Sequence, residues 1–219
     1  MAIKTTFSII LFLILYACDC SDIDEFGRRV TVEIPIRSFP VQTIFSVGDT
    51  IWWEADFSDQ VQVEGVERRM NLKNFKFFPD FVFHHVPLDP ELVDSAIDII
   101  SETGNVTLIS SDEVLYYGMN LVETAERYKL KFATILRKPG IFTAAVNTII
   151  DFDEVDHPAL YMCGKTRRDD FSIRYTNSST NLNTYDSLFI PNLSNPDIIN
   201  GFTFERYAQV GSITFVVNE

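Results

Sequence analysis

A short segment with alternating acidic residues is the first place where this sequence could do chemistry. Asp151, Asp153, Glu154 and Asp156 offer hard carboxylate oxygens, which are the ligands that calcium prefers. The segment lacks the glycine and the terminal glutamate at the spacing of an EF-hand loop, and a solvated acidic loop is the alternative interpretation. A calcium site, and with it a calcium-dependent adhesion module, is therefore one hypothesis for this chain.

Other metal-binding and catalytic patterns are missing from the sequence. It contains no His-Glu-x-x-His, Cys-x-x-Cys or Gly-x-Ser-x-Gly motif. His84 and His85 are adjacent, so on a strand they would point to opposite faces and would not share a zinc ion. A carboxylate pair assembled across strands could still hydrolyse a glycosidic bond. An envelope hydrolase acting on glycans is thus an alternative function, with no catalytic residue assigned and no cofactor expected beyond calcium.

Two neighbouring tryptophans offer a third kind of chemistry, which is recognition. In the alternating segment 51–57, Trp53 falls on the apolar side and Trp52 falls on the side of Glu54 and Asp56. Trp53 is therefore a predicted core residue and Trp52 is predicted to be exposed. An exposed tryptophan can stack on a sugar or anchor a protein partner, so Trp52 is the binding candidate. The alternative is that a loop or a second layer covers it.

The N-terminal residues indicate a cleaved secretory signal followed by a reactive cysteine. Lys4 precedes an apolar run over 7–17, which only Ser8 interrupts. At ~1.5 Å per residue, this run spans about half of the ~30 Å hydrocarbon core of a bilayer, so it is too short to cross one. Cys18 follows it directly. A cysteine thiolate can accept a diacylglycerol group as a thioether, and two or more acyl chains hold a protein stably on a membrane.

Leu15-Tyr16-Ala17-Cys18 resembles the lipobox of bacterial lipoproteins, although Tyr16 replaces the small or branched residue that is usual there. The resemblance implies cleavage before Cys18, a lipid on that cysteine, and a membrane as partner through the lipid. The acidic run from Asp19 to Glu25 is similar to the surface-export signals of Bacteroidota lipoproteins. The expected location is therefore the cell outer membrane, on either face. The alternatives are an ordinary cleaved signal with a chance cysteine and a plain solvated tether.

Charge and composition restrict the other partners. The chain has 18 basic and 31 acidic residues, which give a net charge of −13. Nucleic-acid binding needs basic patches, so no nucleic-acid partner is expected. Aromatic residues make up 13% of the chain, which favours a folded body over disorder. Three cysteines are too few for a disulfide scaffold, and whether Cys20 and Cys163 pair stays open.

Alternating apolar and polar residues dominate the rest of the chain. This pattern predicts half-buried strands, which turn signals at glycines separate. Many short strands with regular turns favour an all-β fold, an antiparallel immunoglobulin-like β-sandwich. Asp89-Pro90-Glu91 predicts the start of a helix, with a strand over 97–100 as the alternative. The expected strands lie at 30–36, 51–57, 75–77 and 81–83 on either side of a Pro79-Asp80 break, 128–132, and about 210–217.

The expected organisation has three parts. Residues 1–17 form the signal peptide, 18–28 an acidic tether, and 29–219 the β-sandwich domain. Residues 151–206 are rich in Asp, Asn, Ser and Pro and have weak periodicity. We expect this stretch to be an irregular insertion of loops and short helices before the last strand.

Two further resemblances fit this interpretation. Tyr128 to Phe132, followed by Arg137-Lys-Pro-Gly-Ile-Phe142, is similar to the late strands of immunoglobulin-like domains, where a Pro-Gly corner leads into an aromatic strand. Phe45 to Asp59 resembles a segment found near the N-terminus of a group of Bacteroidota lipoproteins. The second resemblance implies no activity and transfers no catalytic residue. The leading hypothesis is a lipid-anchored, non-catalytic binding or assembly component whose partner is an envelope protein or a glycan.

The anchor hypothesis predicts that Cys18→Ser releases the protein from membranes, because no lipid can then be attached. Fractionation of cells that express either form measures this directly. The unchanged protein should sediment with membranes and the variant should stay in the supernatant. A variant that still sediments with membranes to the same extent would show that Cys18 is not the anchor.

Overall fold

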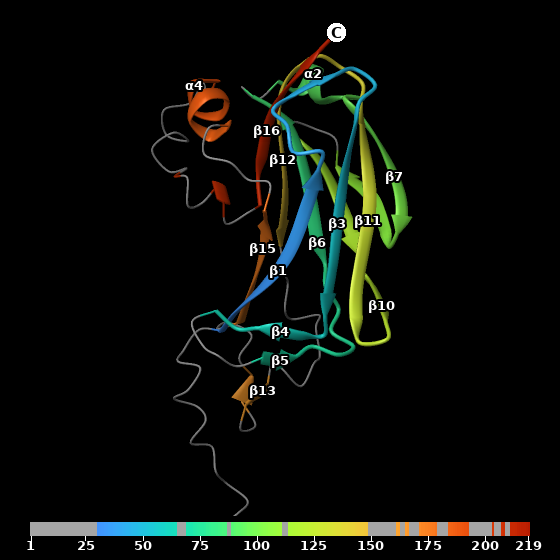
Figure 1. The fold of residues 1–219 in the computed structure, drawn as a ribbon, viewed down its shortest axis with the longest axis vertical. Helices are drawn as coiled ribbons and strands as arrows, with labels where there is room; N and C mark the ends of the chain where they lie inside the picture. Colours follow the sequence, from blue (N-terminus) through green and yellow to red (C-terminus); the bar gives the residue numbers. More distant parts are fainter. Residues whose placement is uncertain are drawn as a thin grey trace, which may run out of the picture.

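Two β-sheets packed face to face form the body of the chain (Figure 1). The all-β sandwich expected from the period-two pattern is confirmed. The computed structural model describes residues 30–64, 69–86, 89–110, 114–148, 161–162, 165–166, 171–178, 184–192, 203, 207–208 and 211–219.

The first sheet is built around β3 and β11, which pair antiparallel along the whole of β3. β1 pairs with one end of β3 and with β15, while β10 and β7 lie along the other side of β11. In Figure 1, β3 and β11 run side by side along the molecule, with β7 next to β11. The strands are β10 (Val122–Thr124), β11 (Arg127–Leu136), β3 (Thr50–Ser58), β1 (Val30–Phe39), β15 (Phe171–Asn177) and β7 (Ile97–Thr103).

The second sheet supplies the other half of the core. Its strands, in spatial order, are β2 (Ile44–Ser46), β16 (Ile213–Asn218), β12 (Gly140–Thr148), β6 (Pro79–His85), β9 (Leu115–Asn120) and β8 (Asn105–Ser110). Two further strand pairs are β4 (Gln60–Gln62) with β5 (Arg69–Asn71), and β13 (Tyr161–Met162) with β14 (Lys165–Thr166).

The helical elements of the described residues are short. They are α2 (Pro90–Val93), the π-helical turn η5 (Tyr185–Phe189) and α4 (Ile190–Asn192). The helix predicted after Asp89 begins at Pro90 but ends within one turn, and β7 begins at Ile97. The strand alternative for 97–100 is therefore confirmed. Among the described residues, no helix has the length and apolar character that crossing a membrane requires.

Three features of the sheets differ from the sequence expectations. β1 pairs parallel with β15 and β2 pairs parallel with β16, so both sheets are mixed rather than wholly antiparallel. β15 lies inside the stretch 151–206, which was expected to contain loops and short helices only. The prediction of a strand at 75–77 followed by a break at Pro79-Asp80 is wrong. Residues 75–78 lie outside any strand, and Pro79 and Asp80 pair with β12 as the first residues of β6. Proline is tolerated there because it occupies the first position of the strand.

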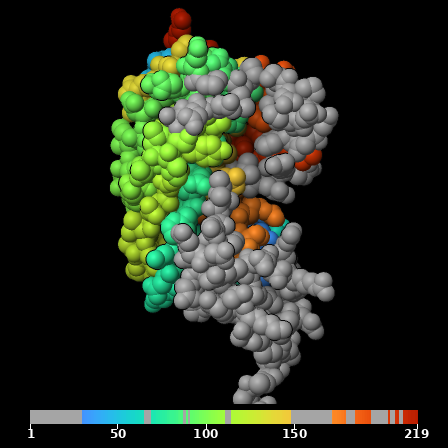
Figure 2. All heavy atoms as spheres, turned by 180° about the vertical axis from the view of Figure 1, so that it is seen from behind, coloured from blue at the N-terminus to red at the C-terminus, as the bar shows by residue number. Residues whose placement is uncertain are grey.

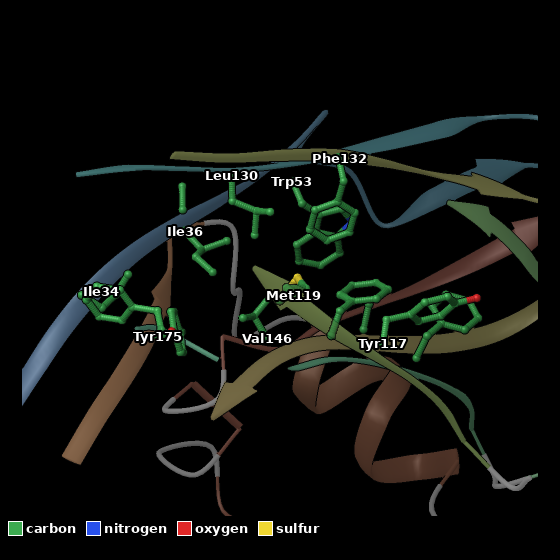
Figure 3. Close-up of a cluster of buried hydrophobic side chains, with 14 of the residues drawn as sticks. Ile34, Ile36, Trp53, Tyr117, Met119, Leu130, Phe132, Val146 and Tyr175 are labelled. Atoms are coloured by element: carbon green, nitrogen blue, oxygen red, sulfur yellow. The ribbon is translucent and has the colours of Figure 1, made fainter. Parts of the chain in front are cut away.

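The core between the sheets is centred on Trp53, as the alternation predicted. Its fully buried ring packs edge-on against Phe81 of the second sheet, with 5.0 Å between centroids, and lies 6.1 Å from Phe132. The indole N–H donates a hydrogen bond of 3.3 Å to the hydroxyl of Thr134. Figure 3 shows how Trp53 and Phe132 from one sheet face Met119 and other side chains of the second sheet. A buried indole with a satisfied N–H is a strongly stabilising core element.

Tyr128 fixes the segment 72–78 against the end of the first sheet. Its buried hydroxyl donates to the carbonyl of Leu72 at 2.7 Å and accepts from the backbone N–H of Phe75 at 2.8 Å. The carboxylate of Glu123 lies 3.2 Å from the same hydroxyl and also accepts from the backbone N–H of Asn74. Burial and the nearby charge of Glu123 raise the pKa of Tyr128 well above its ordinary value. The hydroxyl is therefore a protonated structural link rather than an ionisable group.

A smaller apolar cluster covers part of the outer face of the second sheet. Val86, Tyr185, Phe189 and Tyr207 form this cluster, and the hydroxyl of Tyr207 donates to Thr214 of β16 at 3.0 Å. Figure 1 shows α4 beside β16, and the view from behind in Figure 2 shows green atoms along one side of the molecule and orange atoms of the C-terminal part nearer its centre. In the described part of the chain, this cluster therefore covers part of the outer face of the second sheet.

The hydroxyl of Tyr128 predicts a specific loss of stability. Tyr128→Phe keeps the ring but leaves the buried polar groups of Leu72 and Phe75 without this partner, so the free energy of unfolding should fall by about 1–3 kcal/mol. Urea denaturation measures the change. Tyr116→Phe is the matched control, because Tyr116 has no side-chain hydrogen bond within the described part of the chain. Equal effects of the two substitutions would contradict the assigned role.

Candidate functional site

Trp52 is the one site residue predicted from the sequence that the structure describes. The lipidation and calcium hypotheses therefore stay predictions, as does the pairing of the other two cysteines. The residues outside the described part of the chain are Cys18, Cys20, Cys163 and the candidate calcium ligands Asp151, Asp153, Glu154 and Asp156.

Trp52 belongs to a row of apolar side chains that crosses four strands on the outer face of the first sheet. Phe39 of β1 is opposite Trp52 of β3, Trp52 is opposite Ala133 of β11, and Ala133 is opposite Ile100 of β7. Directly opposed residues on neighbouring strands share a face, so these four residues form a continuous line, which we call the apolar row. Ile100 is 51% exposed, whereas Ala133 is buried between its larger neighbours.

The indole of Trp52 is held in place by its own sheet. Its ring lies 6.5 Å from that of Phe39, with 15° between the planes, and the Nζ of Lys131 lies 4.9 Å from its centroid. A cation over an indole face is an attractive contact that also restricts the ring. Trp52 is consequently part-buried and points outward, on the side that the alternation predicted. Its role in binding stays a prediction.

A charged row runs parallel to the apolar row, one step along the strands. Arg37 of β1 is opposite Glu54 of β3, and Glu54 is opposite Lys131 of β11. Arg37 binds Glu54 at 2.6 Å, and Lys131 binds Glu102 of β7 at 2.7 Å. Arg37, Glu54, Lys131 and Glu102 thus alternate in sign across the same four strands. We call these four residues the charged row.

The charges on the two central strands are sorted by sign. β3 presents Glu54 and Asp56 on this face, while β11 presents Arg127, Lys129 and Lys131. Arg127 binds Asp56 at 2.7 Å, and Lys129 lies directly opposite Asp56. An acidic strand therefore lies beside a basic strand at the centre of the face.

The outer face is electrically balanced, although the chain as a whole carries a net charge of −13. Among the residues that the structure describes, this face carries six basic and six acidic side chains. The basic residues are Arg37, Arg127, Lys129, Lys131, Arg137 and Arg174, and the acidic residues are Glu33, Glu54, Asp56, Glu64, Asp98 and Glu102.

A hollow of about 530 Å³ opens beside the charged row, where β1 and β3 separate. Glu54 and Asp56 both line it, which is the kind of carboxylate pair that the hydrolase alternative requires. Each carboxylate is bound by an arginine, Glu54 by Arg37 and Asp56 by Arg127. A carboxyl group that hydrolyses a glycosidic bond must exchange a proton or attack the sugar, and these ion pairs compete with both roles. The geometry disfavours a hydrolase at this place.

The adjacent histidines of β6 do not form a metal site. His85 packs edge-on against Phe142, with 5.4 Å between ring centroids, while burial lowers the pKa of His84. Among the described residues, no group of three His, Cys, Asp or Glu side chains is placed to hold a metal ion.

Sequence reasoning found Trp52 but missed the rest of its row. Phe39 and Ile100 lie on strands that are separate from β3 in the sequence. No pattern within those segments indicates how they align with β3 and β11. Ala133 is a small residue that no motif singles out. The cross-strand pairing alone brings these residues together.

Comparisons with known proteins give distant structural similarities. No family model and no curated protein matches the sequence. The type II cohesin dyad from the adaptor ScaA scaffoldin of Acetivibrio cellulolyticus is similar over 66% of this chain and 48% of its own, at 9% identity and a TM-score of 0.32. This chain thus spans about half the length of that dyad. The second type II cohesin module of the same scaffoldin is similar over 65% of this chain and 92% of its own, at 9% identity and a TM-score of 0.30. A structure from work on Streptococcus parasanguinis adhesion by Fap1 fimbriae is similar over 47% of this chain and 55% of its own, at 12% identity and a TM-score of 0.22.

The opposite orientations of the two tryptophans predict a clear fluorescence result. Trp52 and Trp53 are the only tryptophans of the chain. Trp52→Phe should shift the emission to shorter wavelength and reduce quenching by iodide several-fold, because only the buried Trp53 remains. Quenching that is the same before and after the substitution would contradict this arrangement.

Proposed function

We propose that this chain is a non-catalytic assembly module of the cell envelope, anchored to the outer membrane by a lipid on Cys18, which docks a protein on its apolar row. The observation that carries the proposal is the apolar row itself, a line of four side chains across the outer face of the first sheet. Its end residue Ile100 keeps 51% of its surface exposed.

The composition of this face fits the anatomy of a protein interface. Such interfaces have an apolar centre with aromatic residues and a polar rim, and tryptophan and arginine are enriched among the residues that dominate the binding energy. Here Trp52 and Phe39 lie in the apolar row, and Arg37 and Lys131 lie beside them in the charged row. The pattern therefore supports a protein as the partner.

A small ligand or a sugar fits this face less well. Small-molecule sites are usually concave and bury most of their ligand, whereas the apolar row lies on the surface of a sheet. Stacking a sugar on Trp52 would also compete with the Nζ of Lys131, which already lies over the ring. The hollow next to the charged row is polar, and its carboxylates are bound by arginines.

Photocrosslinking in cells tests the proposal, because it captures whichever protein lies against the chosen position. A benzophenone amino acid at position 100 should yield one discrete adduct with a second polypeptide under ultraviolet light. Adding Trp52→Ala should weaken that adduct several-fold, since it removes the largest side chain of the row.

Position 108 provides the matched control. Leu108 is 50% exposed on the edge strand of the other sheet, so it resembles Ile100 in exposure but lies outside the row. No adduct is expected there. Absence of any protein adduct at position 100, or an equal adduct at 108, would exclude the apolar row as a docking surface.

A further inference from the structure

We propose that the partner docked on the apolar row is a second copy of this chain, related to the first by a twofold axis that lies parallel to the strands between β3 and β11. This inference rests on the proposed function, because it names the occupant of the same surface. It follows from the order of side chains along the two rows.

The charged row is complementary to itself under this symmetry. A twofold axis that lies between two facing surfaces reverses the order of any row of residues that crosses the axis. The first residue of the row therefore faces the last residue of the same row on the other copy, and the second faces the third. In the charged row the order is Arg37, Glu54, Lys131, Glu102, with the axis between Glu54 and Lys131. Arg37 then faces Glu102 of the second copy, and Glu54 faces Lys131. Every contact in the row joins opposite charges.

The same axis makes the neighbouring rows complementary. Asp56 of β3 and Lys129 of β11 are directly opposite each other. In the dimer, Asp56 of each copy would therefore face Lys129 of the other copy. The general reason is that β3 carries acids and β11 carries bases on this face. An axis between the two strands places the acidic strand of one copy over the basic strand of the other.

The apolar row is complementary in size. Reversal of its order places Trp52, the largest side chain, against Ala133, the smallest, and places Phe39 against Ile100. Large side chains opposite small ones allow two surfaces to interdigitate at the density of a protein interior. The apolar contact and the charged contact thus require one and the same axis.

The charge distribution on the described part of this face favours contact between two copies. Each chain carries a net charge of −13, so two copies repel each other at long range. The outer face of the first sheet is balanced, with six basic and six acidic residues. Approach through this face therefore brings together two surfaces whose described charges cancel.

The test is a set of charge reversals, measured on the full lipidated chain in a nonionic detergent by light scattering with the detergent mass subtracted. The unchanged chain should be a dimer. Lys131→Glu places glutamates opposite each other at both central contacts, and Glu54→Lys places lysines there. Each single variant should weaken the dimer at least tenfold.

An equimolar mixture of the two variants gives the decisive result. In the mixed dimer, the K131E copy presents glutamate at positions 54 and 131, and the E54K copy presents lysine at both. Both central contacts then join opposite charges again. The dimer should therefore return in the mixture, and also in the double variant E54K/K131E.

A matched control distinguishes the effect of where a charge is changed from the effect of the change in net charge. Glu91→Lys changes the charge as much as Glu54→Lys but lies on α2, outside the face, so it should leave the dimer intact. Circular dichroism melting verifies that each variant is folded.

Three outcomes would overturn the inference: a monomeric unchanged chain at tens of micromolar, a dimer that survives both single reversals, or a mixture that stays monomeric. These outcomes are distinguishable from failure of the proposed function. If the chain is monomeric while position 100 crosslinks to a different protein, a second copy is excluded as the partner but the proposed docking function still stands. If the adduct at position 100 contains this chain alone, both proposals are supported.

Discussion

The antiparallel pairing of β3 with β11 is the constraint on which the rest of the structure depends. It extends along the whole of β3 and brings Trp53 beside Phe132 on the inner side of the sheet. Because successive residues of a strand point to opposite sides, the same register places Trp52 beside Ala133 on the outer side. A slip of one residue would exchange the two faces and expose the core. Burial of Trp53 therefore also fixes the outer rows.

The ion pairs of the outer face contribute little to the stability of the fold. Exposed pairs of this kind are usually worth about 0–1 kcal/mol each, because solvent screens them and ordering the long side chains costs entropy. Arg37 and Arg127, for example, are 64% and 48% exposed in their pairs with Glu54 and Asp56. The arrangement of these charges by strand therefore affects which partner can bind the face more than it affects the stability of the fold.

Local patterns were sufficient to predict the faces of β1, β3 and β11 but not their neighbours. Alternation separated Trp52 from Trp53 because one face of β3 is buried and the other is not. β15 escaped prediction because its burial pattern is irregular, with three part-exposed residues in a row between Phe171 and Tyr175. Such a strand at the border of a sheet has no clean period of two. The Pro79-Asp80 break was wrong for a related reason, since a proline at the first strand position interrupts the pattern without interrupting the sheet.

The candidate site was predictable only in part, because it depends on long-range register. Trp52 could be identified from its own segment, whereas its neighbours Phe39 and Ile100 depend on how β1 and β7 align with the central strands. That alignment includes a register shift in the pairing of β7 with β11, between Lys131 and Phe132. No sequence motif marks this shift, although it determines which residues of β7 reach the outer face.

Four edge strands of the sandwich, β2, β7, β8 and β10, are poorly suited to association through their backbone groups. Edge strands can pair with other chains through their free backbone groups, and proteins hinder this by making such strands short or irregular. β2 and β10 have three residues each, and the pairings of β7 and β8 with their neighbours both contain register shifts. The outer face of the second sheet is partly covered by the cluster around Tyr207. Contact through side chains on the outer face of the first sheet requires none of these edges to change. On that face, β11 presents three basic residues, Arg127, Lys129 and Lys131, although the chain as a whole is acidic.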